Sequence, residues 1–367
     1  MRLVASEIVQ PLSPHKNSHH WNNPFSQQIE HRMTTYTQTN NRFTDILAPM
    51  QHCVGFLGVE WATFAYSLLT TVLIFCFSTR LSDPAAMLHS RLYIILGVAV
   101  CVALYRWRPC RLTLFVRRLF PLTLLNVWYP ETYEFCRLFP YWDHLFAGAD
   151  QLLFGCQPSL VFSQVFSSVW WSEAFHLGYF SYYPMILFTV LVPLFCCRDR
   201  FDRTSFVVLS SFFLYYLIYL FLPVGGPQYY FCAIGEGQAA SGIFPEIGNY
   251  LAAHLEMRPS PGADGLFRDL VVMAQHAGER PTAAFPSSHV GISTILLLLM
   301  WHLRRRLVLC LAPFYVLLCC ATVYIEAHYL VDVLAGWVSA VLFYLLTTRL
   351  YDFINRRGWV MNNASGV

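Results

Sequence analysis

Long apolar runs are the feature that most restricts how this chain can fold. A bilayer span needs about 20 mostly apolar residues. Such runs lie at 59–78, 175–197, 206–222, 307–324 and 328–350, with shorter ones at 92–105 and 290–303. Backbone polar groups inside lipid must be satisfied within their own segment, so the runs predict helices. Only 12% of the 367 residues are charged, against roughly 25% in soluble domains. We therefore predict an all-α, polytopic membrane helix bundle.

Arginine clusters give the expected orientation of these helices. They lie at 106–118, 198–203, 304–306 and 349–357, and the positive-inside rule assigns all four to the cytoplasm. The loop 223–288 and the short joint 325–328 are then external. One more crossing is required upstream of residue 175, and residues 119–135 are the candidate. The total is about eight spans, arranged as two leading helices and a six-helix core.

The spans divide the chain into three parts. Residues 1–52 are polar and rich in Asn, Gln, Thr and His, which predicts a weakly ordered, mostly cytoplasmic tail. Residues 53–110 hold the leading helices, and residues 111–358 form the core membrane domain with its external loop 223–288. Most of the twelve cysteines lie in apolar runs, where they act as small hydrophobic residues. The net charge of +3 does not indicate a nucleic-acid partner.

His328 and Asp332 stand four residues apart where the last apolar run begins. Residues i and i+4 share a helix face, so the carboxylate is expected to accept a hydrogen bond from the imidazole. Asp332 is the only acid in that run, where a carboxylate costs at least about 2.5–3.5 kcal/mol. A carboxylate that holds an imidazole fixes its tautomer and raises its nucleophilicity. The pair predicts a nucleophilic histidine, and a helix-packing contact is the alternative.

The stretch "AFPSSHVGIST" begins another apolar run on the same external face. Ser287 or Ser288 is an ordinary N-cap, and the free N–H groups and partial positive charge of a helix start suit a phosphate oxyanion. His289 would protonate a leaving group there as a general acid. The alternative for His289 is a satisfied polar residue at a helix start.

Two of these stretches resemble the signature motifs of a known family. "FPSSHVG" and "YIEAHYLVD" are similar to the second and third motifs of the PAP2 (type 2 phosphatidic acid phosphatase) superfamily. The resemblance implies six core membrane helices and a phosphohistidine mechanism that needs neither metal nor cofactor. Carried over by motif position, it implies that His328 attacks phosphorus, Asp332 orients His328, and His289 protonates the leaving alcohol.

The sequence also departs from the usual family pattern. The first motif normally supplies a lysine and an Arg-Pro, but Lys16 is the only lysine of the chain. The usual arginine six residues before the nucleophile is replaced by Thr322. "ATVYIEAHYLVDV", with Tyr324, and "LPVGGPQYY" are instead similar to the inositol phosphorylceramide synthase branch. That resemblance implies transfer of a phospho-alcohol head group from a phospholipid donor to a sphingolipid or diacylglycerol acceptor.

Without the usual cations, other groups must hold the phosphate. Arg280 is the first candidate, because one arginine can bind two phosphate oxygens; Arg258 and Arg268 share its external loop. The alternative for all three is a solvated loop charge. Gln228 and Tyr229 are expected to line the pocket, together with Tyr324. Three further residues near the outer end of their helix are speculative candidates, namely Glu173, His176 and Tyr182.

These observations predict an integral-membrane enzyme that cleaves or transfers a lipid phosphoester through phospho-His328, with a slight preference for head-group transfer. One alternative is a simple phosphatase acting on phosphatidate, an isoprenyl pyrophosphate or a lipid A phosphate. Another is a non-catalytic lipid or ion transporter with Asp332 as a proton relay. We expect a bacterial inner membrane with a periplasmic site, with a Golgi-type membrane and lumenal site as the alternative. The sequence indicates neither the exact lipids nor an oligomeric state.

Overall fold

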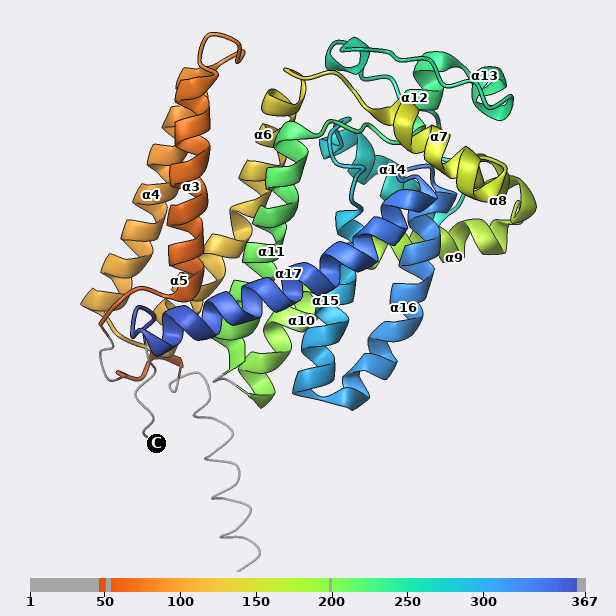
Figure 1. The fold of residues 1–367 in the computed structure, drawn as a ribbon. Helices are drawn as coiled ribbons and strands as arrows, with labels where there is room; N and C mark the ends of the chain where they lie inside the picture. Colours follow the sequence, from red (N-terminus) through yellow and green to blue (C-terminus); the bar gives the residue numbers. More distant parts are fainter. Residues whose placement is uncertain (1–45, 51–53, 198–199, 362–367) are drawn as a thin grey trace, which may run out of the picture. The chain divides into compact units, whose positions relative to one another are not determined.

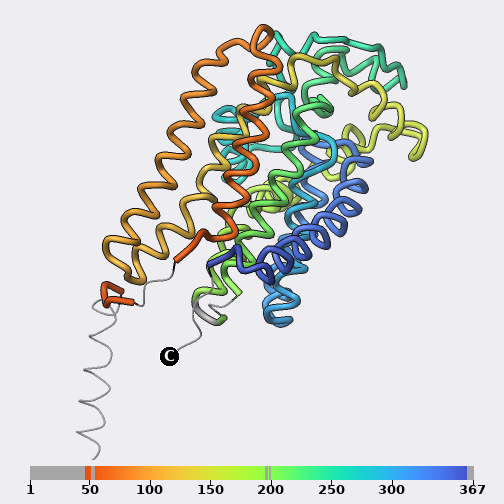
Figure 2. The backbone as a smooth tube through the Cα atoms, turned by 60° about the vertical axis from the view of Figure 1, so that its left-hand side comes forward, coloured from red at the N-terminus to blue at the C-terminus, as the bar shows by residue number. Residues whose placement is uncertain are grey.

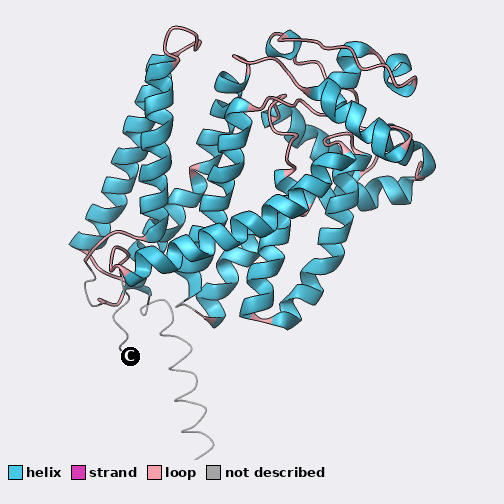
Figure 3. Ribbon diagram, viewed as in Figure 1, coloured by secondary structure: helices cyan, strands magenta, loops and turns pink. Residues whose placement is uncertain are grey.

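The computed structural model describes residues 46–50, 54–197 and 200–361. The chain divides into residues 1–48 and 49–367, and every helix named below belongs to the second unit. Nearly all of the expected polar tail at 1–52 lies outside the described residues. The described ranges contain helices and no strand, which confirms the predicted all-α class (Figure 3).

Five helices are long and apolar enough to cross a membrane: α3 (Gly58–Cys76), α4 (Pro84–Trp107), α11 (Phe201–Phe221), α16 (Arg305–Tyr324) and α17 (Leu330–Arg356). A sixth candidate is the pair α9 (Val169–Phe180) and α10 (Tyr182–Cys196), which is bent by 40° at the break between its two helices. The shorter apolar helix α15 (Ser288–Leu303) completes the set. These helices confirm a multi-pass membrane protein.

The crossing expected at 119–135 is occupied by two shorter helices. α5 (Arg111–Thr123) and α6 (Leu125–Cys136) each contain a proline, Pro121 and Pro130. A proline inside a helix removes a backbone hydrogen bond and favours a bend. Together α5 and α6 run beside α11 (Figure 1), although neither meets the length and hydropathy of a span. The total of eight crossings therefore stays a prediction.

Helix α11 forms the centre of the bundle. Of its most apolar window, 78% is buried, against 28–39% in the other four spans. The leading helices α3 and α4 pack side by side at the edge, where α3 contacts α11 and α4 contacts α5 (Figure 2). Asp83 begins α4 by accepting a hydrogen bond from the Ala86 amide at 2.8 Å, with Pro84 in the first turn; both are common helix-start features.

The described arginines of all four clusters lie at one end of the bundle. Arg118 contacts Asp202 at 2.6 Å, and Arg200 donates to the carbonyl oxygen of His302 at 2.7 Å. Arg203 contacts Asp352 at 3.2 Å. These contacts link one cluster to the next, so the clusters share a side as the positive-inside rule requires. We call this side the inner end.

Short helices and loops cover the opposite, outer end (Figures 1 and 3). They are α7 (Asp143–Phe154), α8 (Pro158–Val165), α12 (Pro227–Ile234), α13 (Glu236–Ala240), the 3₁₀ turn η2 (Tyr250–Ala252) and α14 (Leu266–Gly278). The start of α15 and the joint between α16 and α17 lie at this end as well. Both motif histidines are therefore at the outer end.

Candidate active site

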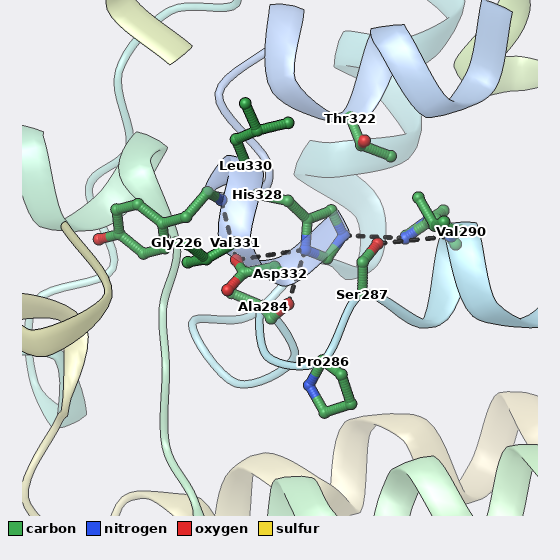
Figure 4. A network of polar contacts seen from close by, with 12 residues as sticks. Gly226, Ala284, Pro286, Ser287, Val290, Thr322, His328, Leu330, Val331 and Asp332 are labelled. Carbon is green, nitrogen blue, oxygen red and sulfur yellow. Dashed lines mark hydrogen bonds and ion pairs between the residues drawn. The ribbon is translucent and has the colours of Figure 1, made fainter. Parts of the chain in front are cut away.

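His328 lies in the joint between α16 and α17, and only 2% of its side chain is exposed. Its backbone amide donates to the carbonyl oxygen of Thr322 at 3.0 Å. Its ring Nδ1 lies 2.7 Å from the carbonyl oxygen of Ala284, in the loop before α15 (Figure 4). A carbonyl oxygen only accepts, so Nδ1 must carry the proton. The lone pair of the neutral ring is then on Nε2, which is the arrangement of a nucleophile.

The prediction of a hydrogen bond between His328 and Asp332 is wrong. Their closest atoms, Nδ1 and Oδ2, are 3.8 Å apart, which is too long for a hydrogen bond. Oδ2 instead accepts the Tyr329 amide at 2.8 Å. Helix α17 begins at Leu330, after the histidine, so His328 does not share a helix face with Asp332. Asp332 occupies the first turn, where its carboxylate satisfies a free backbone amide.

Asp332 nevertheless connects the two motifs. Its carbonyl oxygen accepts the amide of Ser287 at 3.1 Å, which joins α17 to the start of α15. Its second carboxylate oxygen, Oδ1, is buried and has no hydrogen-bond partner within the described ranges. Its carboxyl group also faces the ring of His328 at 3.8 Å. Asp332 is thus placed to stabilise positive charge on that ring and to hold the two helix starts together.

His289 faces His328 from the first turn of α15. Its Nδ1 lies 3.4 Å from Nε2 of His328, and the ring centroids are 5.5 Å apart. Two tyrosines enclose the His289 ring: Tyr179 stacks on it at 4.7 Å, and Tyr182 lies against it at 4.5 Å. The sequence analysis considered Tyr182 but missed Tyr179. Both tyrosines belong to the bend between α9 and α10, a tertiary contact that local spacing does not reveal.

The start of α15 has the expected N-cap. The Oγ of Ser287 accepts the Val290 amide at 3.4 Å, and Ser288, which is buried, is the first residue of the helix. The amides of Ser288 and His289 precede the first intrahelical hydrogen bond. The Ser288 amide faces the Tyr219 hydroxyl, and helix geometry leaves that of His289 available to an anion. A helix start of the kind that can bind an anion thus lies beside the paired histidines.

Burial lowers the pKa of His328 to about 4, and the hydrogen bond to the Ala284 carbonyl offsets part of this effect. Desolvation disfavours the charged imidazolium, so a buried histidine loses its proton more easily. The ring of His328 is therefore neutral at neutral pH. A neutral ring with Nδ1 protonated is the form in which Nε2 can attack phosphorus.

Gln228 and Tyr229 are buried in α12 but have other partners. The side-chain amide of Gln228 donates to Glu279 at 2.7 Å and accepts from Gln275 at 3.2 Å. Tyr229 packs in an apolar cluster that includes Tyr141 and Leu251. The predicted pocket-lining role of both residues remains a prediction.

The arginines of the external loop have structural partners. Arg258 pairs with Glu326 at 2.7 Å and with Glu236 at 3.1 Å. Arg268 pairs with Asp264 and donates to the carbonyl oxygen of Ser260. Both residues therefore hold the loop in place, and a role in binding phosphate remains a prediction.

Arg280 is exposed and donates to the carbonyl oxygen of its neighbour Glu279 at 2.9 Å. Among the contacts of the described residues, none joins it to either motif histidine. Its expected role in binding phosphate thus remains a prediction.

Three other predicted residues anchor the outer layer. Tyr324 is buried, packs on Phe175 and donates to the carbonyl oxygen of Phe166 at 3.2 Å. Glu173 accepts two amides at the start of α14, and His176 lies 2.9 Å from the Oγ of Ser260. The structure brings none of the three into contact with His289 or His328 in the part of the chain it describes.

Two aspartates of α7 hold the backbone around the nucleophile, and the sequence analysis missed them. Asp150 accepts the amides of Leu330 and Val331, each at 2.9 Å. Asp143 accepts the amides of Gly225 and Gly226 at 2.9 and 2.8 Å, and the Tyr329 hydroxyl at 3.0 Å. The spacing of seven in "DHLFAGAD" places both acids on one helix face, which is the signal that was available.

Gly226 shows how closely these segments approach. Its φ is +89°, and a Cβ at this position would lie 2.6 Å from the carbonyl oxygen of Ala327, the neighbour of His328. Only glycine meets both conditions without strain. The "VGGP" turn, α7 and the His328 joint are therefore packed backbone against backbone.

The described residues hold no group of three or more His, Cys, Asp or Glu side chains arranged to bind a metal ion. The site consists of a neutral buried histidine, a second histidine opposite it, and the start of a helix. The transformation this arrangement suits is attack by a ring nitrogen on a bound phosphoester.

Comparison with known proteins agrees with this chemistry. The model of the PAP2 superfamily matches residues 144–346, from α7 through the external loop into α17. No curated protein and no solved structure matches the chain. The matched residues include both histidines, Asp150 and Asp332, and they make up more than half of the chain. The protein therefore belongs to the PAP2 superfamily.

Proposed function

We propose that the protein is an integral-membrane lipid phosphotransferase that moves a phosphorylated head group by way of a phosphohistidine at His328. Membership of the PAP2 superfamily supports a phosphatase-type lipid function in general, and transfer between lipids is the finer proposal. The observation that carries it is the pair of facing rings, Nε2 of His328 and Nδ1 of His289, at 3.4 Å.

The first step forms a bond between Nε2 of His328 and phosphorus. The ester oxygen leaves with the electron pair of its bond to phosphorus and takes a proton from His289. The amides at the start of α15 bind the phosphoryl oxygens. The His328 ring becomes positively charged as it is phosphorylated, and the Asp332 carboxylate, 3.8 Å away, stabilises that charge. The head group, as its phosphoryl ester, is then held on the enzyme.

The second step reverses the first with another alcohol. His289, now neutral, takes the proton of an acceptor hydroxyl, whose oxygen attacks phosphorus and breaks the bond to nitrogen. His328 returns to its neutral form. Water in place of the acceptor would make the enzyme a phosphatase. The packing of Tyr179 and Tyr182 against His289 supports transfer, because apolar ring faces reduce the access of water to the general base.

The departures from the usual motifs also support transfer. Thr322 stands at the position of the usual arginine, is fully buried, and donates to the carbonyl oxygen of Cys319. It supplies no positive charge to the site. We propose a phospholipid donor and a sphingolipid or diacylglycerol acceptor. We also propose an active site on the outer face of a bacterial inner membrane, with the lumenal face of a Golgi-type membrane as the alternative.

The test is a transfer assay on the full chain in vesicles that contain head-group-labelled phosphatidylinositol. Ceramide, or a diacylglycerol whose acyl chains differ from those of the donor, is added as the acceptor. The expected result is acceptor-dependent appearance of label on the second lipid, together with an acid-labile phosphoenzyme. His328→Gln should abolish both signals. His254→Gln is the matched control, because His254 is an exposed histidine of the same outer end that bonds only locally, to the Tyr250 carbonyl.

Two outcomes would overturn this proposal. Release of inorganic phosphate from a monoester at a rate independent of any acceptor would make the protein a phosphatase. Full turnover by His328→Gln would remove the phosphohistidine altogether.

A further inference from the structure

Residues 151–172 connect α7, α8 and α9 and contain no charged residue. We call this segment the apolar corner. Its exposed side chains are unusually large and apolar: Leu152 is 85% exposed, Val165 67% and Trp170 86%. Five more of its apolar residues are exposed as well, namely Leu153, Phe154, Val161, Val169 and Trp171. An apolar surface of this extent marks a site of association with lipid or protein.

The other side of the corner packs on the membrane bundle. Leu160 of α8 is buried, and Phe162 contacts Tyr324, the last residue of α16, with ring centroids 5.8 Å apart. The corner continues into α9, the first half of the bent span α9–α10. It therefore lies level with the outer ends of the spans and extends their lipid-facing surface (Figure 1).

We infer that the apolar corner lies in the interfacial layer of the outer leaflet, with membrane lipid as its occupant. Helix α8 has eight residues and is about 12 Å long, far shorter than the roughly 30 Å of a bilayer core. A short, uncharged, two-sided helix lies along the interface, where tryptophan is enriched. Lipid is favoured over a second copy because the corner is continuous with the surface of a span.

The corner is one helix away from the paired histidines. The buried face of α7 carries Asp143 and Asp150, which bind the backbone beside His328. The exposed end of the same helix carries Leu152 and Leu153. The corner thus places the outer surface of the membrane next to the site. Lipid substrate then enters the site from the outer leaflet along α7. This consequence rests on the proposed function, whereas the burial of the corner in lipid does not.

Site-specific fluorescence quenching tests the burial itself. The full chain is placed in phospholipid vesicles. The fluorescence of Trp170 is obtained by subtracting the emission of Trp170→Phe from that of the wild type. The expected result is that brominated phospholipids quench this difference and aqueous iodide does not. Trp128→Phe is the control, since Trp128 is 1% exposed in the protein interior and neither quencher should reach it.

Two results would overturn the inference. Quenching of the Trp170 signal by iodide would show that the corner faces water. Protection from both quenchers would show that protein, such as a second copy, covers it.

A second experiment tests the entry of substrate. Leu152→Glu should raise the apparent KM for lipid substrate in vesicles about tenfold at unchanged kcat, because a carboxylate at this position opposes contact with an apolar layer. Leu255→Glu is the matched control, because Leu255 is a 43% exposed apolar residue of the external loop outside the corner. An unchanged KM in Leu152→Glu would refute the entry route. Lipid quenching at Trp170 without any transfer by the wild type would refute the proposed function and leave the lipid contact standing.

Discussion

The two ends of the bundle are held together by different chemistry. At the inner end, buried ion pairs join helix side chains: Arg117 contacts Glu60 at 2.6 Å, and Arg118 contacts Asp202 at 2.6 Å. At the outer end, besides the Arg258–Glu326 ion pair, carboxylates bind backbone amides. Asp143 and Asp150 each accept two amides, and Asp332 accepts the Tyr329 amide at the start of its own helix α17.

The difference follows from what each end must hold. Inner-end segments are mostly long helices whose backbone groups are already paired, so side chains make most of the contacts that join them. At the outer end the chain turns repeatedly, and helix starts and loops leave amides unpaired. A carboxylate that binds two successive amides fixes both the position and the direction of a loop. The inner-end contacts therefore contribute mainly to stability, and the outer-end contacts fix the position of the backbone around His328.

After His328, His289 is the residue whose replacement should give the largest loss of rate without loss of fold. His289→Gln removes the proposed acid and keeps the size of the side chain. We expect kcat to fall about 10³-fold, within the range typical of general acid catalysis. A donor ester with a strongly acidic leaving alcohol needs no proton and should recover most of the rate. An equal loss with both donors would assign His289 to binding rather than to proton transfer.

Replacing Arg117 should affect stability and leave the chemistry unchanged. Arg117 and Glu60 are each 1% exposed, and a second hydrogen bond joins them at 2.7 Å. Arg117→Met leaves a buried carboxylate without its cation, which we expect to lower the free energy of unfolding by about 3–5 kcal/mol. Arg117→Met with Glu60→Gln should recover part of the loss. The measurement is unfolding in mixed detergent, with kcat of the folded fraction as the control; a large fall in that kcat would contradict the comparison.

Replacing Asp150 should lower the rate more than the stability, which is the reverse of the effect of replacing Arg117. Asp150→Ala leaves the amides of Leu330 and Val331 without their acceptor, and each charge-assisted bond contributes about 1.5–3 kcal/mol. We expect kcat to fall about 10²-fold as His328 loses its alignment, with KM little changed. Asp150→Asn keeps one acceptor oxygen and should recover part of the rate. A loss confined to stability would make α7 a structural support only.

How far the sequence predicted these features depends on how far apart in the chain the contacting residues lie. The spans, the inner arginine clusters and the meeting of His289 with His328 follow from hydropathy, charge and the order of motifs, and the structure shows them. The predicted hydrogen bond from His328 to Asp332 was wrong because i,i+4 spacing holds only within a helix, and α17 begins after His328. Tyr179 and Asp150 were missed because their contacts join segments that are distant in the sequence.

The carboxylates of α7 should also set the pH dependence of the rate. Burial raises the pKa of Asp143 and of Asp150 to about 6, against the hydrogen bonds that lower it. As the pH falls below about 6, each gains a proton and one acceptor oxygen becomes a donor that faces an amide. The neutral form of His328 persists down to a pKa of about 4. We therefore expect kcat/KM to fall below pH 6 rather than near pH 4.

The double variant Asp143→Asn with Asp150→Asn tests this assignment. It has no carboxylate to titrate on α7, so its lower rate should be nearly constant between pH 7 and 5. A wild-type profile that is flat down to pH 5 would exclude the aspartates as the titrating groups.

The smallest effect is expected at a half-exposed ion pair of the inner end. Arg203 and Asp352 lie 3.2 Å apart, with 36% and 45% of their side chains exposed. Solvent screens such a pair, which contributes about 0–1 kcal/mol. Arg203→Met should therefore change neither kcat nor, beyond that range, the free energy of unfolding. A loss of stability as large as that of Arg117→Met would mean that solvent exposure does not decide how much an inner-end ion pair contributes. The contrast between buried ion pairs at one end and amide-binding carboxylates at the other would then need a cause other than burial.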